Sequence, residues 1–139
     1  MSPIRVVFEA CRATSEISEY GVDIFCLFDD LHHYLMIQRS RRKEPGVFGD
    51  IHFECDGQGW GGYDVIETLQ VTDGRLQVRL NPAAQDAVDF DNRLEYDIGL
   101  AMPPASWASH EAFLRQMLGG IPFFMRTVQD DAQTQTRAE

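Results

Sequence analysis

Apolar and polar side chains alternate along much of this chain with a period of two residues, which is the spacing of a strand buried on one face. The alternation is clearest over residues 50–56, where the apolar positions are Ile51, Phe53 and Cys55 and the polar ones are His52, Glu54 and Asp56. Similar runs occupy residues 4–8, 63–71, 76–80 and 94–100, while residues 23–28 and 34–37 are apolar on both faces. The pattern predicts a largely antiparallel β-sheet of about six to seven strands.

Turn and capping residues divide these strands and add two helices. Asp73-Gly74 has the chemistry of a tight hairpin turn, and residues 29–32 make a short connection between two apolar runs. Asn81 followed by Pro82 predicts the start of a short helix near residues 82–88. A second helix, with Ser106 as its cap, is predicted near residues 106–119 and ends at Gly119-Gly120. The expected class is therefore α+β.

The organisation is that of one domain with a tail. Residues 1–125 form a single expected domain, in which Phe123, Phe124 and Met125 anchor the chain against the domain or against a second subunit. Residues 126–139 are polar and predict a disordered tail. The start of the chain lacks the pattern of a secretory signal, and no apolar run is long enough to span a membrane, so we expect a cytoplasmic protein.

The formal net charge is −10, and it is unevenly distributed. Acidic residues dominate between Glu44 and Glu111, where Arg75, Arg79 and Arg93 are the only arginines or lysines, and basic residues cluster at 39–43. Such a field disfavours nucleic acid and anionic membranes and steers a basic partner toward the acidic side. The simpler alternative is that the charge serves solubility.

No arrangement of reactive residues fits a known catalytic pattern. Residues 57–62 match the letters G-x-G-x-x-G, but a strand-like segment follows them where a dinucleotide site needs a helix. Cys11, Cys26 and Cys55 lie in strand-like runs and are expected to be buried structural thiols. His32 or His33 could meet His52, Glu54 and Asp56 in a metal site, but a solvated strand face is the favoured interpretation. We therefore predict no enzyme activity, no cofactor and no metal.

One segment is typical of a recognition surface. Trp60 and Tyr63 stand in a glycine-rich stretch beside Asp56, Asp64 and Glu67, and Glu95 and Asp97 add acidic positions on a later strand. Aromatic anchors with charges around them are common at protein interfaces. These residues form the predicted partner-binding surface; alternatively, Trp60 packs over the sheet edge as a lid.

The order of these motifs resembles the Immunity protein 10 family of bacterial polymorphic-toxin systems. The resemblance covers roughly residues 4–121. Its most specific parts are the run Tyr34-Leu35-Met36-Ile37-Gln38-Arg39 and the segment from Gln58 through Gly59-Trp60-Gly61-Gly62-Tyr63, after Ile51-His52-Phe53-Glu54. The basic stretch at residues 39–43 and the chain after Pro122 fall outside the shared pattern.

The resemblance implies a non-enzymatic protein that binds a cognate toxin effector domain and blocks it. An acidic inhibitor suits a toxin with a basic active-site surface, because complementary charge accelerates association. Two alternatives stay open: a ligand-binding or scaffolding domain with an apolar pocket between the sheet and the C-terminal helix, and a metal-dependent enzyme using His32 or His33 with His52 and Glu54.

Overall fold

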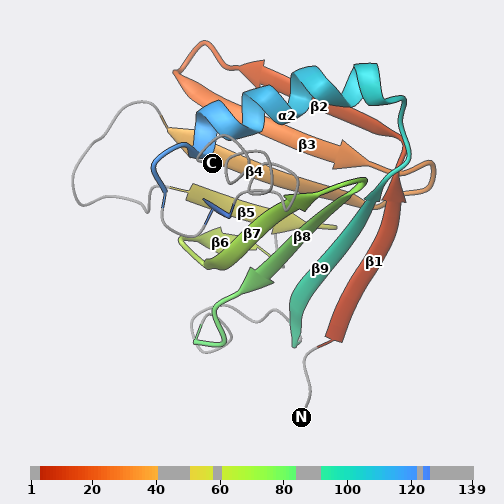
Figure 1. Ribbon diagram of the computed structural model, residues 1–139. Coiled ribbons are helices and arrows are strands. Elements are labelled where there is room, and N and C mark those ends of the chain that lie inside the picture. Colours follow the sequence, from red (N-terminus) through yellow and green to blue (C-terminus); the bar gives the residue numbers. More distant parts are fainter. Residues whose placement is uncertain (1–3, 41–50, 58–60, 84–91, 122–123, 126–139) are drawn as a thin grey trace, which may run out of the picture.

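The structure is a computed structural model that describes residues 4–40, 51–57, 61–83, 92–121 and 124–125. These residues form two five-stranded sheets and one helix (Figure 1). The first sheet has the order β1 (Ile4–Ala10), β9 (Arg93–Leu100), β8 (Arg75–Leu80), β7 (Ile66–Thr72) and β10 (Phe124–Met125). The second has the order β2 (Arg12–Ile17), β3 (Val22–Phe28), β4 (Tyr34–Ser40), β5 (Ile51–Cys55) and β6 (Gly61–Tyr63). The predicted α+β class with largely antiparallel pairing is confirmed, although the strands divide between two sheets and outnumber the expected six to seven.

The apolar residues of the alternating pattern lie on the inner faces, where the two sheets pack against each other. Phe53 of β5 meets Tyr96 of β9 edge to face, with ring centroids 4.9 Å apart. Neither side chain has appreciable contact with solvent. Burial of such rings from both layers is the main stabilising contribution to a two-layer core. The outer faces of the two sheets consequently point away from each other.

The two sheets are continuous with one another at two corners. The chain passes from β1 to β2 at Cys11, whose N–H donates to Phe28 O at 2.9 Å. It passes from β6 to β7 at Asp64, which has a left-handed backbone with a φ of 55°. The sequence predicted one strand-like run over residues 63–71, and that prediction is wrong because the turn at Asp64 moves the chain from one sheet to the other.

The single described helix, α2 (Pro104–Leu118), begins two residues earlier than the sequence predicted. Pro103 is the capping residue and Pro104 occupies the first turn, where its missing N–H costs no hydrogen bond. Ser106 therefore lies inside the helix and is not its cap. The predicted end is confirmed, because the helix stops at Leu118 before Gly119, and Gly120 has a φ of 82°.

Helix α2 packs on the inner side of the second sheet, along β2 and β3 (Figure 1). Trp107 contacts Phe25 edge to face at 6.0 Å, and Ser15 Oγ lies 2.7 Å from His110 Nδ1. Leu114 and Leu118 are fully buried. The helix thus leaves the outer face of the second sheet open. No helix in the described part of the chain is long and apolar enough to cross a membrane.

The predicted hairpin is confirmed: β7 and β8 pair antiparallel around Asp73-Gly74, with Gly74 at a φ of 78°. Phe124, in β10, pairs parallel to β7 and packs against the core, so this member of the predicted anchor contacts its own domain. Several predictions concern residues outside the described ranges: the short helix beyond residue 83, Trp60, residues 41–43, Phe123 and the tail after residue 125.

Candidate functional site

The outer face of the second sheet carries three rows of side chains that run across its strands. The strand registers define them: Arg12, Phe28 and Tyr34; Thr14, Cys26, Met36, Glu54 and Gly61; and Glu16, Ile24, Gln38, His52 and Tyr63. We call this surface the β2–β6 face. It combines aromatic, aliphatic and polar groups, which is the composition of a surface able to bind another protein.

A buried carboxylate organises the β5 end of this face. Glu54 is 6% exposed, accepts a short hydrogen bond from the Tyr34 hydroxyl, and lies 3.2 Å from His52 Nε2. Burial and the hydrogen bond to Glu54 raise the pKa of Tyr34, so its hydroxyl keeps its proton and donates it.

The second ring nitrogen of His52 has no hydrogen-bond partner among the described residues. This atom, Nδ1, is buried. Tyr63 lies beside the same ring at a centroid distance of 4.9 Å, while 48% of Tyr63 is exposed. The Tyr63 ring therefore packs against His52, which Glu54 holds in place, and the exposed part of the ring faces solvent.

Gly61 allows strand β6 to approach β5 closely at this point. A Cβ at Gly61 would lie 2.9 Å from the carbonyl oxygen of Phe53 and 3.2 Å from Cβ of Glu54. A side chain there would push β6 away and displace Tyr63, two residues later. Gly61 therefore serves close packing of two strands, a use typical of glycine inside a sheet.

Two of the predicted acidic positions hold the backbone instead of forming a free charged surface. Asp56, at a φ of 60°, accepts the N–H of Tyr34 at 2.9 Å and contacts His33 Nδ1 at 2.9 Å. Asp64 accepts the N–H of Ile51 at 3.0 Å and returns a hydrogen bond from its own N–H to Ile51 O. Both carboxylates stabilise turns beside the β2–β6 face.

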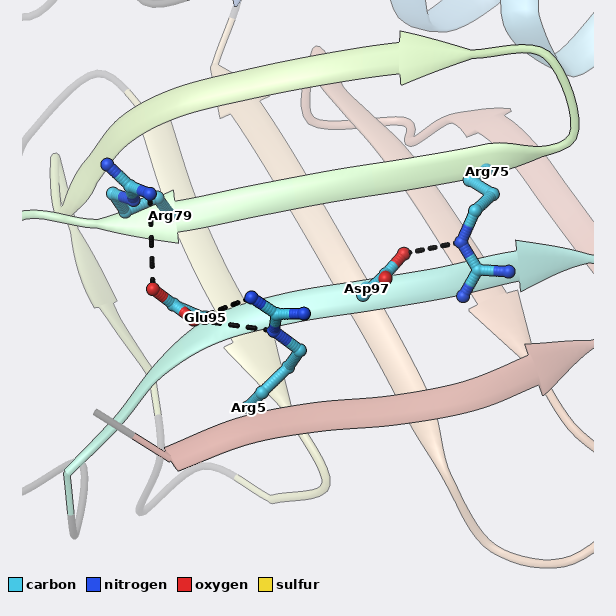
Figure 2. A network of polar contacts seen from close by, with 5 residues as sticks. All are labelled: Arg5, Arg75, Arg79, Glu95 and Asp97. Atoms are coloured by element: carbon cyan, nitrogen blue, oxygen red, sulfur yellow. Dashed lines mark hydrogen bonds and ion pairs between the residues drawn. The ribbon is translucent and has the colours of Figure 1, made fainter. Parts of the chain in front are cut away.

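Glu67, Glu95 and Asp97 lie on the first sheet, away from Tyr63. Glu67 is exposed at an irregularity in the pairing of β7 with β8. Figure 2 shows Glu95 and Asp97 within a network that also contains Arg5, Arg75 and Arg79. The six described residues of the predicted partner-binding surface therefore do not form one surface, because the outer faces of the two sheets point in opposite directions.

His33 and His52 contact different carboxylates. His33 contacts Asp56 and stacks on Phe8 at 5.6 Å, while His52 contacts Glu54. His52 and Glu54 share a strand face, as the alternation predicted. In the ranges that the structure describes, no group of three or more histidine, cysteine, aspartate or glutamate side chains is placed to hold a metal ion.

The cysteines differ from one another in burial. Cys26 and Cys55 are buried, as predicted, and burial raises the pKa of the Cys55 thiol. Cys11 is exposed and its Sγ lies 3.0 Å from Asp30 Oδ1, so the prediction of a buried thiol is wrong at this position. Its place at the corner between β1 and β2 explains the exposure. The hydrogen bond to Asp30 raises its pKa as well.

The space between the second sheet and α2 is filled by Leu114, Met117 and Leu118, all nearly inaccessible to solvent. These three side chains occupy the place where a ligand-binding domain was expected to have an apolar pocket. A hollow of about 310 Å³ lies instead on the outer face of the first sheet, with polar side chains predominating in its lining.

Sequence reasoning missed Tyr34, Gly61 and Arg5 as members of these surfaces. Tyr34 and Glu54 are twenty residues apart, and the register that brings them together depends on the pairing of β4 with β5. Arg5 reaches Glu95 because β1 pairs with β9, the strand farthest from it in sequence apart from β10. The sequence indicated only which residues of each strand point outward, and this alternation does not say which strands are neighbours.

The chain matches no protein-family model, no curated protein and no solved structure.

Proposed function

We propose that this protein binds a cognate toxin domain in the bacterial cytoplasm and neutralises it by covering its active site, without catalysing a reaction itself. The proposed contact surface is the β2–β6 face around Tyr63. The toxin part of the proposal rests on the motif order that resembles the Immunity protein 10 family. The position of the contact surface rests on the side chains described above.

The observation that carries the proposal is the arrangement of Tyr63 on His52. A half-exposed aromatic ring is held on a histidine whose other side is fixed by the buried Glu54. Such a ring loses little conformational freedom on binding, since neighbouring groups already restrict it. Exposed, preorganised tyrosines are characteristic of the residues that dominate the binding free energy of protein interfaces.

The surrounding chemistry favours a partner with basic groups. Glu16 is exposed in the same row as Tyr63, and the chain as a whole carries a formal charge of −10. A basic toxin surface would be attracted over long distances and would find an aromatic ring for cation–π contact on arrival. Trp60, three residues before Tyr63, stays a predicted second anchor.

Affinity measurements test the contact surface. The proposal expects a toxin domain encoded beside this gene, and that domain is titrated with the wild-type protein and with Tyr63→Ala. We expect the dissociation constant to rise at least ~10-fold if the ring is an anchor. Tyr20→Ala is the matched control, because Tyr20 is 72% exposed and lies in the turn between β2 and β3. An equal effect of both substitutions, or none from Tyr63→Ala in a folded protein, contradicts the proposed surface.

A growth assay tests the toxin itself. Co-expression of the wild-type protein with the neighbouring toxin domain should restore growth of the host cells, because a bound toxin cannot reach its substrate. Continued killing despite abundant folded protein would reject the immunity function, whichever face makes the contact.

A further inference from the structure

The outer face of the first sheet carries a charge arrangement that the proposed toxin contact does not use. Arg5 of β1, Glu95 of β9, Arg79 of β8 and Thr68 of β7 lie in register across four neighbouring strands. The next row holds Asp97, Gln77 and Gln70. Figure 2 shows the charged members of both rows projecting from the same face. Together these side chains border the hollow of about 310 Å³.

Two guanidinium groups in this hollow share one carboxylate. Arg5 Nε and Nη2 both lie 3.4 Å from Glu95 Oε2, and Arg79 Nη2 lies 3.9 Å from Glu95 Oε1. These distances exceed the usual 2.7–2.9 Å of a charge-assisted hydrogen bond. By contrast, Arg75 Nε lies 2.6 Å from Asp97 Oδ1, a close one-to-one pair. Arg5 and Arg79 are therefore loosely held around Glu95.

Because the pairing is loose, N–H groups of Arg5 and Arg79 remain exposed to solvent and available to donate hydrogen bonds. The side chains of Arg5 and Arg79 are 62% and 60% exposed, and among the described residues Glu95 is the only carboxylate within ion-pair distance of either. The lining also includes the Thr68 hydroxyl and the amides of Gln70 and Gln77. Each of these groups can donate a hydrogen bond to an oxygen anion. The five-residue network has three guanidinium groups and two carboxylates, and the charge of Glu9 also acts on Arg75. The excess of positive charge is therefore confined to Arg5 and Arg79, which share Glu95.

We propose that Arg5 and Arg79 bind a carboxylate on an acidic segment of a protein partner, which lies across the first sheet. Charge complementarity selects a carboxylate, and the planar forks of arginine suit its two oxygens. The chain's overall charge repels every anionic ligand, an acidic segment included, and a segment can offset this repulsion by hydrogen bonds with the amides along the sheet. Because this face points away from Tyr63, the inference is independent of the proposed toxin contact.

Peptide titrations followed by two-dimensional NMR of the ¹⁵N-labelled full-length chain test this site. The probe is acetyl-GTETG-amide, and the isosteric control is acetyl-GTQTG-amide. We expect the glutamate peptide to shift the Arg5 and Arg79 Nε–H resonances and the Thr68 and Gln77 amides, and to bind at least ~5-fold more tightly than the glutamine peptide. Added salt should weaken the binding. Equal binding of the two peptides overturns the proposal.

Three variants distinguish a binding site from a structural ion pair. Arg5→Gln and Arg79→Gln should each weaken the glutamate peptide about fivefold, while Arg12→Gln, an exposed arginine on the second sheet, should leave it unchanged. Glu95→Gln should tighten binding, because it removes the internal carboxylate that competes for the two arginines. Unchanged or weaker binding of the glutamate peptide by Glu95→Gln contradicts the proposal. The proposal also fails if inorganic phosphate shifts the same resonances and binds as tightly as the peptide.

Discussion

Arg39 Nη1 donates a hydrogen bond to the carbonyl oxygen of Met117 at 2.5 Å and so joins strand β4 to the last turn of α2. The carbonyls of a final helical turn lack partners within the helix and carry partial negative charge, which a guanidinium group satisfies. Arg39 also lies opposite Asp23, a carboxylate that is only 7% exposed, in the pairing of β3 with β4. The first residue of the basic stretch therefore has a structural role inside the fold.

Removing this guanidinium should destabilise the protein. Arg39→Gln loses the charged donor at the helix end and leaves Asp23 without the neighbouring positive charge. We expect the free energy of unfolding to fall by about 2 kcal/mol, as measured by urea denaturation. The control is Arg12→Gln, because Arg12 is exposed and its guanidinium lies 4.7 Å from the Phe28 ring centroid. A similar loss of stability in both variants would argue against a special role for the bond to Met117.

The Tyr34 hydroxyl should contribute measurably to stability. Tyr34→Phe removes one of the two side chains, Tyr34 and His52, that contact the buried Glu54 carboxylate, and a hydrogen bond to a charged group contributes about 1.5–3 kcal/mol. We expect the unfolding free energy to fall within that range. Tyr20→Phe, at a position that is 72% exposed, should change it little. A stability for Tyr34→Phe equal to that of the wild type would show that Glu54 is adequately solvated without the tyrosine.

Two glycine substitutions in strands should differ in their effects. A Cβ at Gly61 meets the backbone carbonyl of Phe53 at 2.9 Å, whereas the three atoms nearest a Cβ at Gly99 belong to the end of the Glu9 side chain, which can rotate away. Gly61→Ala should therefore cost about 1–3 kcal/mol of unfolding free energy, and Gly99→Ala less than about 0.5 kcal/mol. Thermal and urea unfolding of both variants measure the difference. Equal losses would mean that Glu9 is as firmly fixed as the backbone of β5.

The pair formed by His33 and Asp56 should make stability depend on pH. The hydrogen bond to Asp56 raises the pKa of His33, and the charges of Asp56 and Asp29 act in the same direction. The folded protein thus holds this proton more tightly than the unfolded chain does. The stabilisation is complete below the unfolded pKa of about 6.5 and is lost as the pH rises through the folded value.

Urea denaturation at pH 5.5 and pH 8.5 checks this dependence. The wild type should lose more stability between the two conditions than His33→Gln, by a modest amount because the His33 side chain is half exposed. His32→Gln is the control, since His32 is exposed in the same loop. A wild-type pH dependence that matches His33→Gln would show that the pair does not contribute.

The sequence correctly predicted the elements that depend on residues close together in the chain, such as the turns between neighbouring strands. The β7–β8 hairpin follows from Asp73-Gly74, since Gly74 adopts the positive φ that the turn requires. The link between β3 and β4 is closed by Asp29, whose carboxylate accepts the N–H groups of Leu31 and His33 at 2.9 Å. By contrast, β2 escaped prediction because Ala13 and Ser15, two of its three inward positions, are small or polar, and the third, Ile17, is exposed at the strand end.

The candidate surface was only partly predictable. Tyr63 was identified from its sequence neighbourhood, and the alternation placed His52 with Glu54 on one strand face. The Tyr34 hydroxyl on Glu54 depends on the register of β4 with β5, which no local pattern specifies. Asp56 and Asp64 were expected as interface charges, yet their left-handed backbones make them turn residues. A carboxylate near an aromatic residue in sequence can serve either purpose, and hydrogen-bond geometry decides between them.

The sequence by itself determined the strand periodicity, the hairpin and the helix end, because these depend on backbone preferences and on burial of alternate side chains. Only the tertiary structure decided that the strands divide into two sheets and that Glu95 and Asp97 face away from Tyr63. Pairing β1 with β9 requires contacts between residues some ninety positions apart. Such long-range pairing reflects the packing of the whole core, so the surface positions of charged residues follow from the complete fold and not from their neighbours in the chain.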